Sequence, residues 1–98
     1  MANFTELIKQ SDLVLVDFYA DWCGPCKTMS PILTEVKKHF NDKLKVLKIN
    51  VDNNQGLSAK LQIRGVPTLM LYKSSQQVWR QSGVVNVNQL ISLVNSHL

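Results

Sequence analysis

An apolar run that ends shortly before a pair of cysteines constrains this chain more than any other feature. Residues 13–20 are apolar except for Asp17 and do not alternate with polar residues, which indicates a strand buried on both faces. Cys23 and Cys26 follow, and a helix is predicted over residues 24–40. Its apolar residues recur at the spacing of one helix face: Met29, Ile32, Leu33, Val36 and Phe40. The sequence therefore places two thiols between a buried strand and a helix.

The remaining pattern predicts an α/β fold, a mixed sheet with helices on both faces. We expect a strand over residues 44–51, parallel to the first, because strand–helix–strand units cross over right-handedly into parallel pairs. Two further strands, over 68–72 and 77–82, form a hairpin across residues 74–76. Short helices are predicted over 3–10 and 56–63. A last helix begins at residue 86 or 87 and buries Leu90, Ile91, Leu93, Val94 and Leu98.

Length and charge narrow the class of protein. The 98 residues are expected to form one domain, 1–98, and no apolar stretch approaches the roughly 20 residues that span a bilayer. The net charge of +4 comes from dispersed lysines, which favours a solvated surface over a nucleic-acid interface. The first residues carry no export signal, so we expect a cytoplasmic protein. In that reducing compartment a cysteine pair is more often catalytic or metal-binding than structural.

The spacing of the two cysteines favours redox chemistry. A helix N-terminus favours negative charge, so the pKa of the Cys23 thiol is expected to be lowered, and Pro25 fits the first helical turn. Cys23 should be nearer the surface and attack, whereas Cys26, one turn into the helix, should be shielded and resolve. A zinc site and inert core thiols are the alternatives. Zinc normally recruits four ligands, and the two histidines stand apart in amphipathic helices, so we predict no metal.

Asp17 is the second candidate for chemistry. It interrupts the apolar strand six residues before Cys23, and burial should raise the pKa of its carboxyl group. Such a group can exchange protons near neutral pH, although a satisfied structural carboxylate is the alternative. Lys48 on the neighbouring strand could face Asp17 or could simply lie on the surface.

Three further residues lie near the expected dithiol or in the hairpin. Pro67, just before a strand, could follow a trans bond, the commoner form, or a cis bond. Trp22 adjoins the cysteines, and we interpret it as part of a partly exposed docking surface rather than of the core. Trp79 in the hairpin is interpreted as packing.

These motifs, in this order, resemble the thioredoxin family. The resemblance covers nearly the whole chain. It is carried by residues 16–27 (VDFYADWCGPCK), 31–33 (PIL), 48–52 (KINVD), 63–69 (IRGVPTL) and Gly83.

The resemblance implies a fold and a set of residue roles. The fold is a mixed central sheet of about four strands flanked by about four helices. Cys23 becomes the nucleophile and Cys26 the resolving thiol. Asp17 becomes the buried proton acceptor, with Lys48 as its neighbour, and Pro67 a cis-proline opposite the dithiol. The docking surface comprises Trp22, Gly24, Pro25, Val66, Pro67 and Gly83.

The resemblance also implies an activity and partners. The chain is expected to reduce disulfide-containing substrate proteins by dithiol–disulfide exchange, to be recycled by an NADPH-dependent thioredoxin reductase, to bind no cofactor itself and to act as a monomer. An oxidase or isomerase with the same fold, and a binding module that uses the docking face for assembly, are the alternatives. The Gly-Pro spacer and the absence of an export signal favour the reductase.

Three features of the sequence depart from the family pattern. The first strand of typical members is missing, so four strands rather than five are expected, with an exposed or rearranged edge. Tyr19 stands where tryptophan is common. Ser74 and Ser75 replace an Asn-Gly-type turn, which leaves the geometry of the hairpin turn open.

Overall fold

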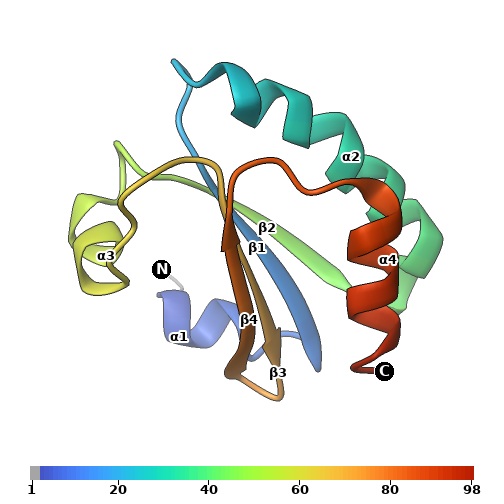
Figure 1. The fold of residues 1–98 in the computed structure, drawn as a ribbon. Coiled ribbons are helices and arrows are strands. Elements are labelled where there is room, and N and C mark those ends of the chain that lie inside the picture. The colour runs from blue at the N-terminus through green and yellow to red at the C-terminus, as the bar shows by residue number, and fades with distance from the viewer. Residues whose placement is uncertain (1–2) are drawn as a thin grey trace.

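A single sheet with helices on both faces organises the chain (Figure 1). The computed structural model describes residues 3–98; Met1 and Ala2, on which the prediction of no export signal partly rests, lie outside the described residues. The elements in chain order are α1 (Phe4–Leu7), β1 (Leu13–Tyr19), α2 (Gly24–Phe40), a 3-10 turn (Asn41–Lys43), β2 (Lys45–Asn50), α3 (Gln55–Lys60), β3 (Thr68–Lys73), β4 (Gln76–Ser82) and α4 (Val87–Asn95). Within residues 3–98 no helix is long and apolar enough to cross a membrane.

The sheet has the order β2-β1-β3-β4, which confirms the predicted mixed sheet of four strands. β1 pairs in parallel with β2, as the strand–helix–strand pattern predicts, and antiparallel with β3. β3 and β4 form the predicted hairpin. β1 is therefore an interior strand, which explains its unbroken run of buried residues.

Two apolar cores lie on opposite faces of the sheet. α2 and α4 cover one face, where Leu13 and Leu15 of β1 join Met29 and Leu33 of α2. α1 and α3 cover the other face, where Val14, Val16 and Phe18 point. Because side chains alternate along a strand, Asp17 belongs to the face that α2 covers. The fold thus places the buried carboxyl group on the same side of the sheet as the dithiol.

The termini of several elements differ from prediction. α1 covers only Phe4–Leu7 instead of residues 3–10, although Asn3 caps it as a short polar residue should, accepting the Glu6 N–H at 2.9 Å. The side chain of Leu98, predicted to be buried, is 58% exposed because α4 ends at Asn95. Trp79 packs against the core on the α2 and α4 face, as predicted.

The hairpin turn contains two residues, Ser74 and Ser75, with φ angles of 50° and 69°. Positive φ at both positions is what a two-residue hairpin turn of the favoured hand requires, and it suits asparagine or glycine better than serine. The side chain of Ser74 compensates by donating a hydrogen bond to Asp12 at 2.7 Å, and its backbone N–H donates to the Asp12 carbonyl at 2.8 Å.

Ser75→Gly is expected to stabilise the protein. Ser75 has a Cβ atom in left-handed backbone, so removing that atom should raise the free energy of unfolding by about 0.5–1 kcal/mol, net of the greater freedom of glycine in the unfolded chain. Urea denaturation of the two proteins measures the change. Ser75→Ala keeps the Cβ atom and should show no such gain; an equal gain in both variants would contradict this account.

Candidate active site

The two cysteines lie at the N-terminal end of α2 and form a disulfide, with Cα atoms 5.3 Å apart. Cys23 is the N-cap residue, and its sulfur accepts a hydrogen bond from the Cys26 backbone N–H at 3.1 Å. Gly24 and Pro25 form the first turn, where proline loses no hydrogen bond. After reduction, the same N–H and the helix dipole would favour negative charge on the Cys23 sulfur.

Exposure does not distinguish the two cysteines, contrary to our expectation. Cys23 is 4% exposed and Cys26 is 5% exposed, because both pack with Ala20, Tyr19 and Val66. Their surroundings do differ. The Cys23 sulfur lies 3.6 Å from the Val66 carbonyl oxygen, whereas Cys26 lines a small cavity on the other side.

The loop that carries Val66 and Pro67 lies against the dithiol. The Val66–Pro67 bond is cis, as the family resemblance implies. The Pro67 carbonyl accepts a hydrogen bond from the Gly83 N–H at 2.8 Å, and Gly83 has a φ of 92°, which glycine adopts without a Cβ penalty. This contact brings Val66, Pro67 and Gly83, which are far apart from Cys23 in sequence, to one side of the dithiol.

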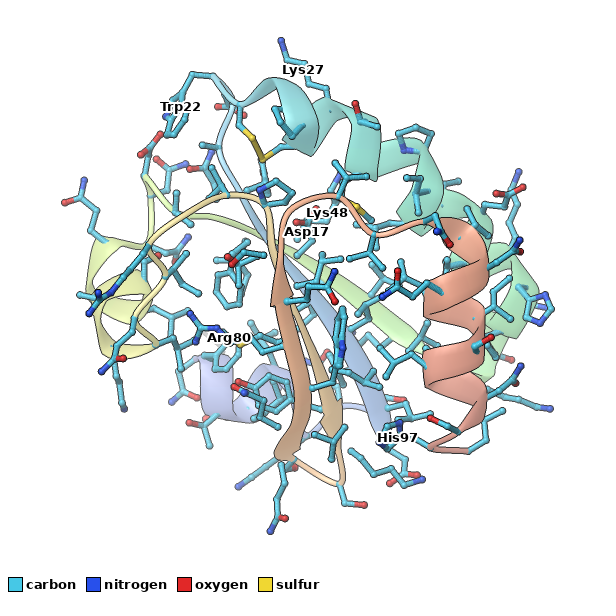
Figure 2. All side chains as sticks on the ribbon, viewed as in Figure 1. Asp17, Trp22, Lys27, Lys48, Arg80 and His97 are labelled. Atoms are coloured by element: carbon cyan, nitrogen blue, oxygen red, sulfur yellow. A yellow bond between two sulfur atoms is a disulfide. The ribbon has the colours of Figure 1, made fainter. Side chains whose placement is uncertain are left out.

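Trp22 supplies an exposed apolar surface beside the disulfide (Figure 2). Its side chain is 71% exposed, which confirms the predicted exposure. Its indole Nε1–H donates to Asp52 at 2.9 Å, and the Asp52 N–H in turn donates to the Asn50 side-chain oxygen at 2.9 Å. The sequence interpretation gave Asp52 and Asn50 no role. Their only signal was their place in the KINVD stretch that carried the resemblance.

Asp17 is fully buried, and neither of its carboxyl oxygens has a hydrogen-bond partner among residues 3–98. Burial raises the pKa of this carboxyl group to about 6, and the charge of Lys48 opposes part of that rise. Asp17 and Lys48 are paired positions on β1 and β2, and Figure 2 shows both on the α2 side. Lys48 therefore neighbours Asp17, as the resemblance implies, but its side chain is exposed, as the alternative had it.

Lys48 does not form an ion pair with Asp17. Its ammonium group donates to the Ser30 hydroxyl of α2 at 2.7 Å and lies 5.6 Å from the centre of the Tyr19 ring. The same three side chains line a cavity of about 170 Å³ together with Cys26. A cavity of this size has room for water beside Cys26, on the side of the sheet to which Asp17 belongs, although Asp17 itself does not line it.

The described residues contain no group of three or more His, Cys, Asp or Glu side chains arranged to hold a metal ion. His39 contacts Phe40 edge-on at the end of α2, and the His97 ring hydrogen-bonds to the Leu93 carbonyl of α4. The two cysteines are bonded to each other instead. The chemistry available at this site is therefore that of a reversible disulfide on the same side of the sheet as a buried carboxyl group.

Comparison with known proteins gives one consistent result. The family model named Thioredoxin matches residues 1–96. A thioredoxin from Haemophilus influenzae is 42% identical over 98 residues, covering 99% of this chain and 92% of the relative, and one from Rickettsia felis is 41% identical over 98 residues, covering 99% and 93%.

The structures of relatives agree with this result. A mutant thioredoxin from Halobacterium salinarum superposes with a TM-score of 0.87 at 38% identity, covering 99% of this chain and 87% of that one. An oxidised mitochondrial thioredoxin from Saccharomyces cerevisiae gives 0.84 at 34% identity, covering 95% and 86%. The chain therefore belongs to the thioredoxin family, and its Cys23–Cys26 pair is the redox centre of a protein-disulfide reductase that acts by dithiol–disulfide exchange.

Proposed function

We propose that Cys23 is the attacking thiol and Cys26 the resolving thiol. The Cys23 thiolate attacks one sulfur of a substrate disulfide, and the other substrate sulfur leaves as a thiolate. Cys26 then loses its proton and attacks the Cys23 sulfur, which releases the second substrate thiolate and closes the Cys23–Cys26 disulfide. The substrate gains two electrons from the dithiol, and its thiolates take protons from water. The Cys26 N–H bonded to the Cys23 sulfur supports this order.

Asp17 accepts the proton of Cys26 in this scheme. With a pKa of about 6, its carboxyl group is mostly ionised at neutral pH and can still be protonated readily. Lys48 and Ser30 line the cavity beside Cys26, and the proposed transfer requires water to bridge from this cavity to the buried Asp17. Lys48 acts as a positioning residue whose charge keeps the pKa of Asp17 from rising further.

Substrate chains dock on the surface around the dithiol. Trp22 is exposed there, Gly24 and Pro25 present the first turn of α2, and Val66 and Gly83 flank Pro67. The backbone of Val66 is available to pair with an extended substrate segment in the manner of an added strand. This arrangement supports recognition of peptide backbone next to a disulfide rather than of one particular sequence.

The family implies a reductase partner that restores the dithiol. We infer that this partner uses NADPH, that the protein works in the cytoplasm, and that residues 1–98 act as a monomeric single domain without a cofactor of their own. An oxidising compartment would close the dithiol and remove the need for such a partner.

The reduction potential of the Cys23–Cys26 pair tests the direction of electron flow. The pair is equilibrated in buffers of defined thiol–disulfide ratio, and the fraction of dithiol is measured by alkylation. We expect a value near −270 mV, typical of a reductant; a value of about −180 to −120 mV would instead indicate an isomerase or oxidase. Retained biological activity in a variant with both Cys23→Ser and Cys26→Ser would favour the assembly-module alternative.

A further inference from the structure

β2 forms one edge of the sheet, and no strand among residues 3–98 pairs with its outer side. The Val51 N–H donates to the Tyr19 carbonyl at 2.9 Å, so the backbone groups of Ile49 and Leu47, two and four residues earlier, also point towards β1. Those of Val46, Lys48 and Asn50 point outwards. The Asn50 carbonyl accepts a hydrogen bond from the Asn54 side chain at 2.8 Å, which leaves Val46 and Lys48 as the free pairing positions.

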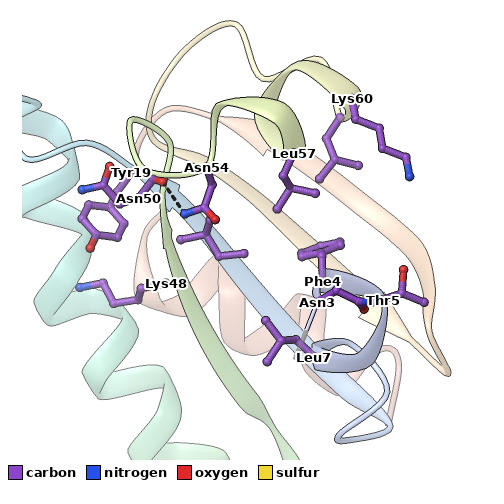
Figure 3. A pocket seen from close by; sticks show the side chains of 12 residues that line it. Asn3, Phe4, Thr5, Leu7, Tyr19, Lys48, Asn50, Asn54, Leu57 and Lys60 are labelled. Carbon is purple, nitrogen blue, oxygen red and sulfur yellow. Dashed lines mark hydrogen bonds between the residues drawn. The ribbon is translucent and has the colours of Figure 1, made fainter. Parts of the chain in front are cut away.

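A groove of about 860 Å³ adjoins the second half of β2, residues 48–50, on the α1 and α3 face (Figure 3). Its apolar lining comes from three elements: Phe4 and Leu7 of α1, Ile49 of β2, and Leu57 of α3 with the following Leu61. Figure 3 shows Phe4 and Leu57 near each other, between α1 and α3. An extended chain beside β2 would place every second side chain in this groove.

A second pocket lies on the opposite face of the same edge. It measures about 250 Å³ and lies between β2 and α2, with Val46 and Leu33 in its lining. Lys37, Lys38 and Lys48 also line it. Neither this pocket nor the groove has an aspartate or glutamate in its lining, within the described chain. Lys48 and Lys60 also line the groove, so lysines lie on both faces of the edge, with the larger apolar side chains gathered in the groove.

We propose that the outer edge of β2 binds an extended protein segment that carries apolar side chains on one face and acidic side chains on the other. The backbone of the segment pairs with Val46 and Lys48 as an added strand. Its apolar side chains enter the groove between α1 and α3, and its acidic side chains meet the lysines beside α2. This surface does not include Trp22 or Val66, but it shares Tyr19 and Lys48 with the cavity beside Cys26.

A second copy of this chain fits the edge poorly. If two β2 strands paired, each would bring Lys45 and Lys48 to an edge already lined by Lys37 and Lys38. Like charges in such proximity oppose pairing, and β2 itself has no acidic residue to offset them. Charge complementarity therefore favours an acidic partner over self-association.

A seven-residue peptide in which valine and glutamate alternate tests the proposal. It is titrated into the ¹⁵N-labelled oxidised protein, and amide shifts and hydrogen exchange are followed. We expect the largest shifts and new exchange protection at Val46 and Lys48. The matched peptide of alternating valine and lysine should bind at least about tenfold more weakly, because it brings positive charge to the lysines.

Two charge reversals on the protein test the role of the lysines: Lys38→Glu within the second pocket, and Lys9→Glu as the matched control outside both pockets. Lys38→Glu should weaken binding of the acidic peptide about fivefold and strengthen binding of the basic one. Lys9→Glu makes the same change in net charge away from both pockets and should leave both affinities unchanged. Reductase activity should be the same in both variants, because neither lysine lies at the dithiol.

Three results would overturn the proposal. The first is the absence of any shift up to millimolar acidic peptide. The second is a set of shifts centred on Trp22 and Val66, which would place the peptide on the dithiol face. The third is a concentration-dependent shift of Val46 and Lys48 without peptide, accompanied by dimer formation in sedimentation, which would assign the edge to a second copy.

Discussion

Replacing Cys23 by serine is expected to abolish disulfide reduction, a loss of at least about a thousandfold, because the attacking thiolate is removed. Cys26→Ser should also stop turnover but leave the first attack intact. The Cys26→Ser protein should therefore accumulate a covalent mixed disulfide between Cys23 and its substrate. Turnover is followed with a disulfide-bonded protein substrate, and the adduct is detected by mass on a non-reducing gel.

Comparing the covalent adducts formed by the two single variants shows which cysteine attacks the substrate. The chain has only two cysteines, so any adduct in Cys26→Ser must be on Cys23, and any adduct in Cys23→Ser must be on Cys26. An adduct only in Cys23→Ser would reverse the two roles. The double variant should form no adduct and serves as the control for non-covalent association.

Much of the fold could be predicted from apolar periodicity. The unbroken apolar run of β1 required burial on both faces, and the structure places it between β2 and β3. The apolar stripe predicted a helix over residues 24–40, and α2 covers Gly24–Phe40. Both ends are well defined, because Cys23 caps the N-terminus and Asn41, which follows the last residue, has a φ of 50°. Short elements were less accurate. α1 has one turn, too few residues for a period to define its end.

The site was predicted where local chemistry decides it and missed where distant loops meet. The position of Asp17 in an apolar strand was enough to predict its burial and the direction of its pKa shift. The cis form of the Val66–Pro67 bond could be predicted only from the resemblance. Without it, the general preference of X-Pro bonds for the trans form would have given the wrong answer. The equal exposure of Cys23 and Cys26 depends on the neighbouring Val66 loop, which helix geometry does not describe. The Trp22–Asp52 hydrogen bond likewise joins residues 30 positions apart.

Asp17→Asn should make the protein more stable at pH 7 and a slower reductase. Burial raises the pKa of Asp17 from 3.8 to about 6, so the folded protein holds a proton between these values that the unfolded chain has released. Stability contributed by this group is therefore full below pH 3.8 and is lost as the pH rises to about 6. A shift of this size corresponds to about 3 kcal/mol, all of it lost at pH 7.

The uncharged amide of Asp17→Asn removes this loss. We expect urea denaturation at pH 7 to show a gain of about 2 kcal/mol, since an unpartnered amide still costs some free energy of burial. The gain should shrink as the pH falls from about 6 towards 4, because the aspartate of the parent protein becomes protonated there. Asp12→Asn is the matched control. Pairing with Lys73 and Ser74 lowers the pKa of Asp12, so its replacement should reduce stability at neutral pH and leave reductase activity unchanged.

Catalysis distinguishes a proton acceptor from a carboxyl group that is merely buried. If Asp17 takes the proton of Cys26, Asp17→Asn should slow the release of substrate from the mixed disulfide by about 10- to 100-fold, and the rate should lose its dependence on pH near 6. Formation of the mixed disulfide by Cys23 should be little affected. A variant that gains stability and keeps both rates between pH 6 and 8 would show that Asp17 has no part in proton transfer. Because the same ionisation governs stability and rate, the rate should titrate near pH 6, where the loss of stability in the parent protein is nearly complete, and both pH dependences should disappear together in Asp17→Asn.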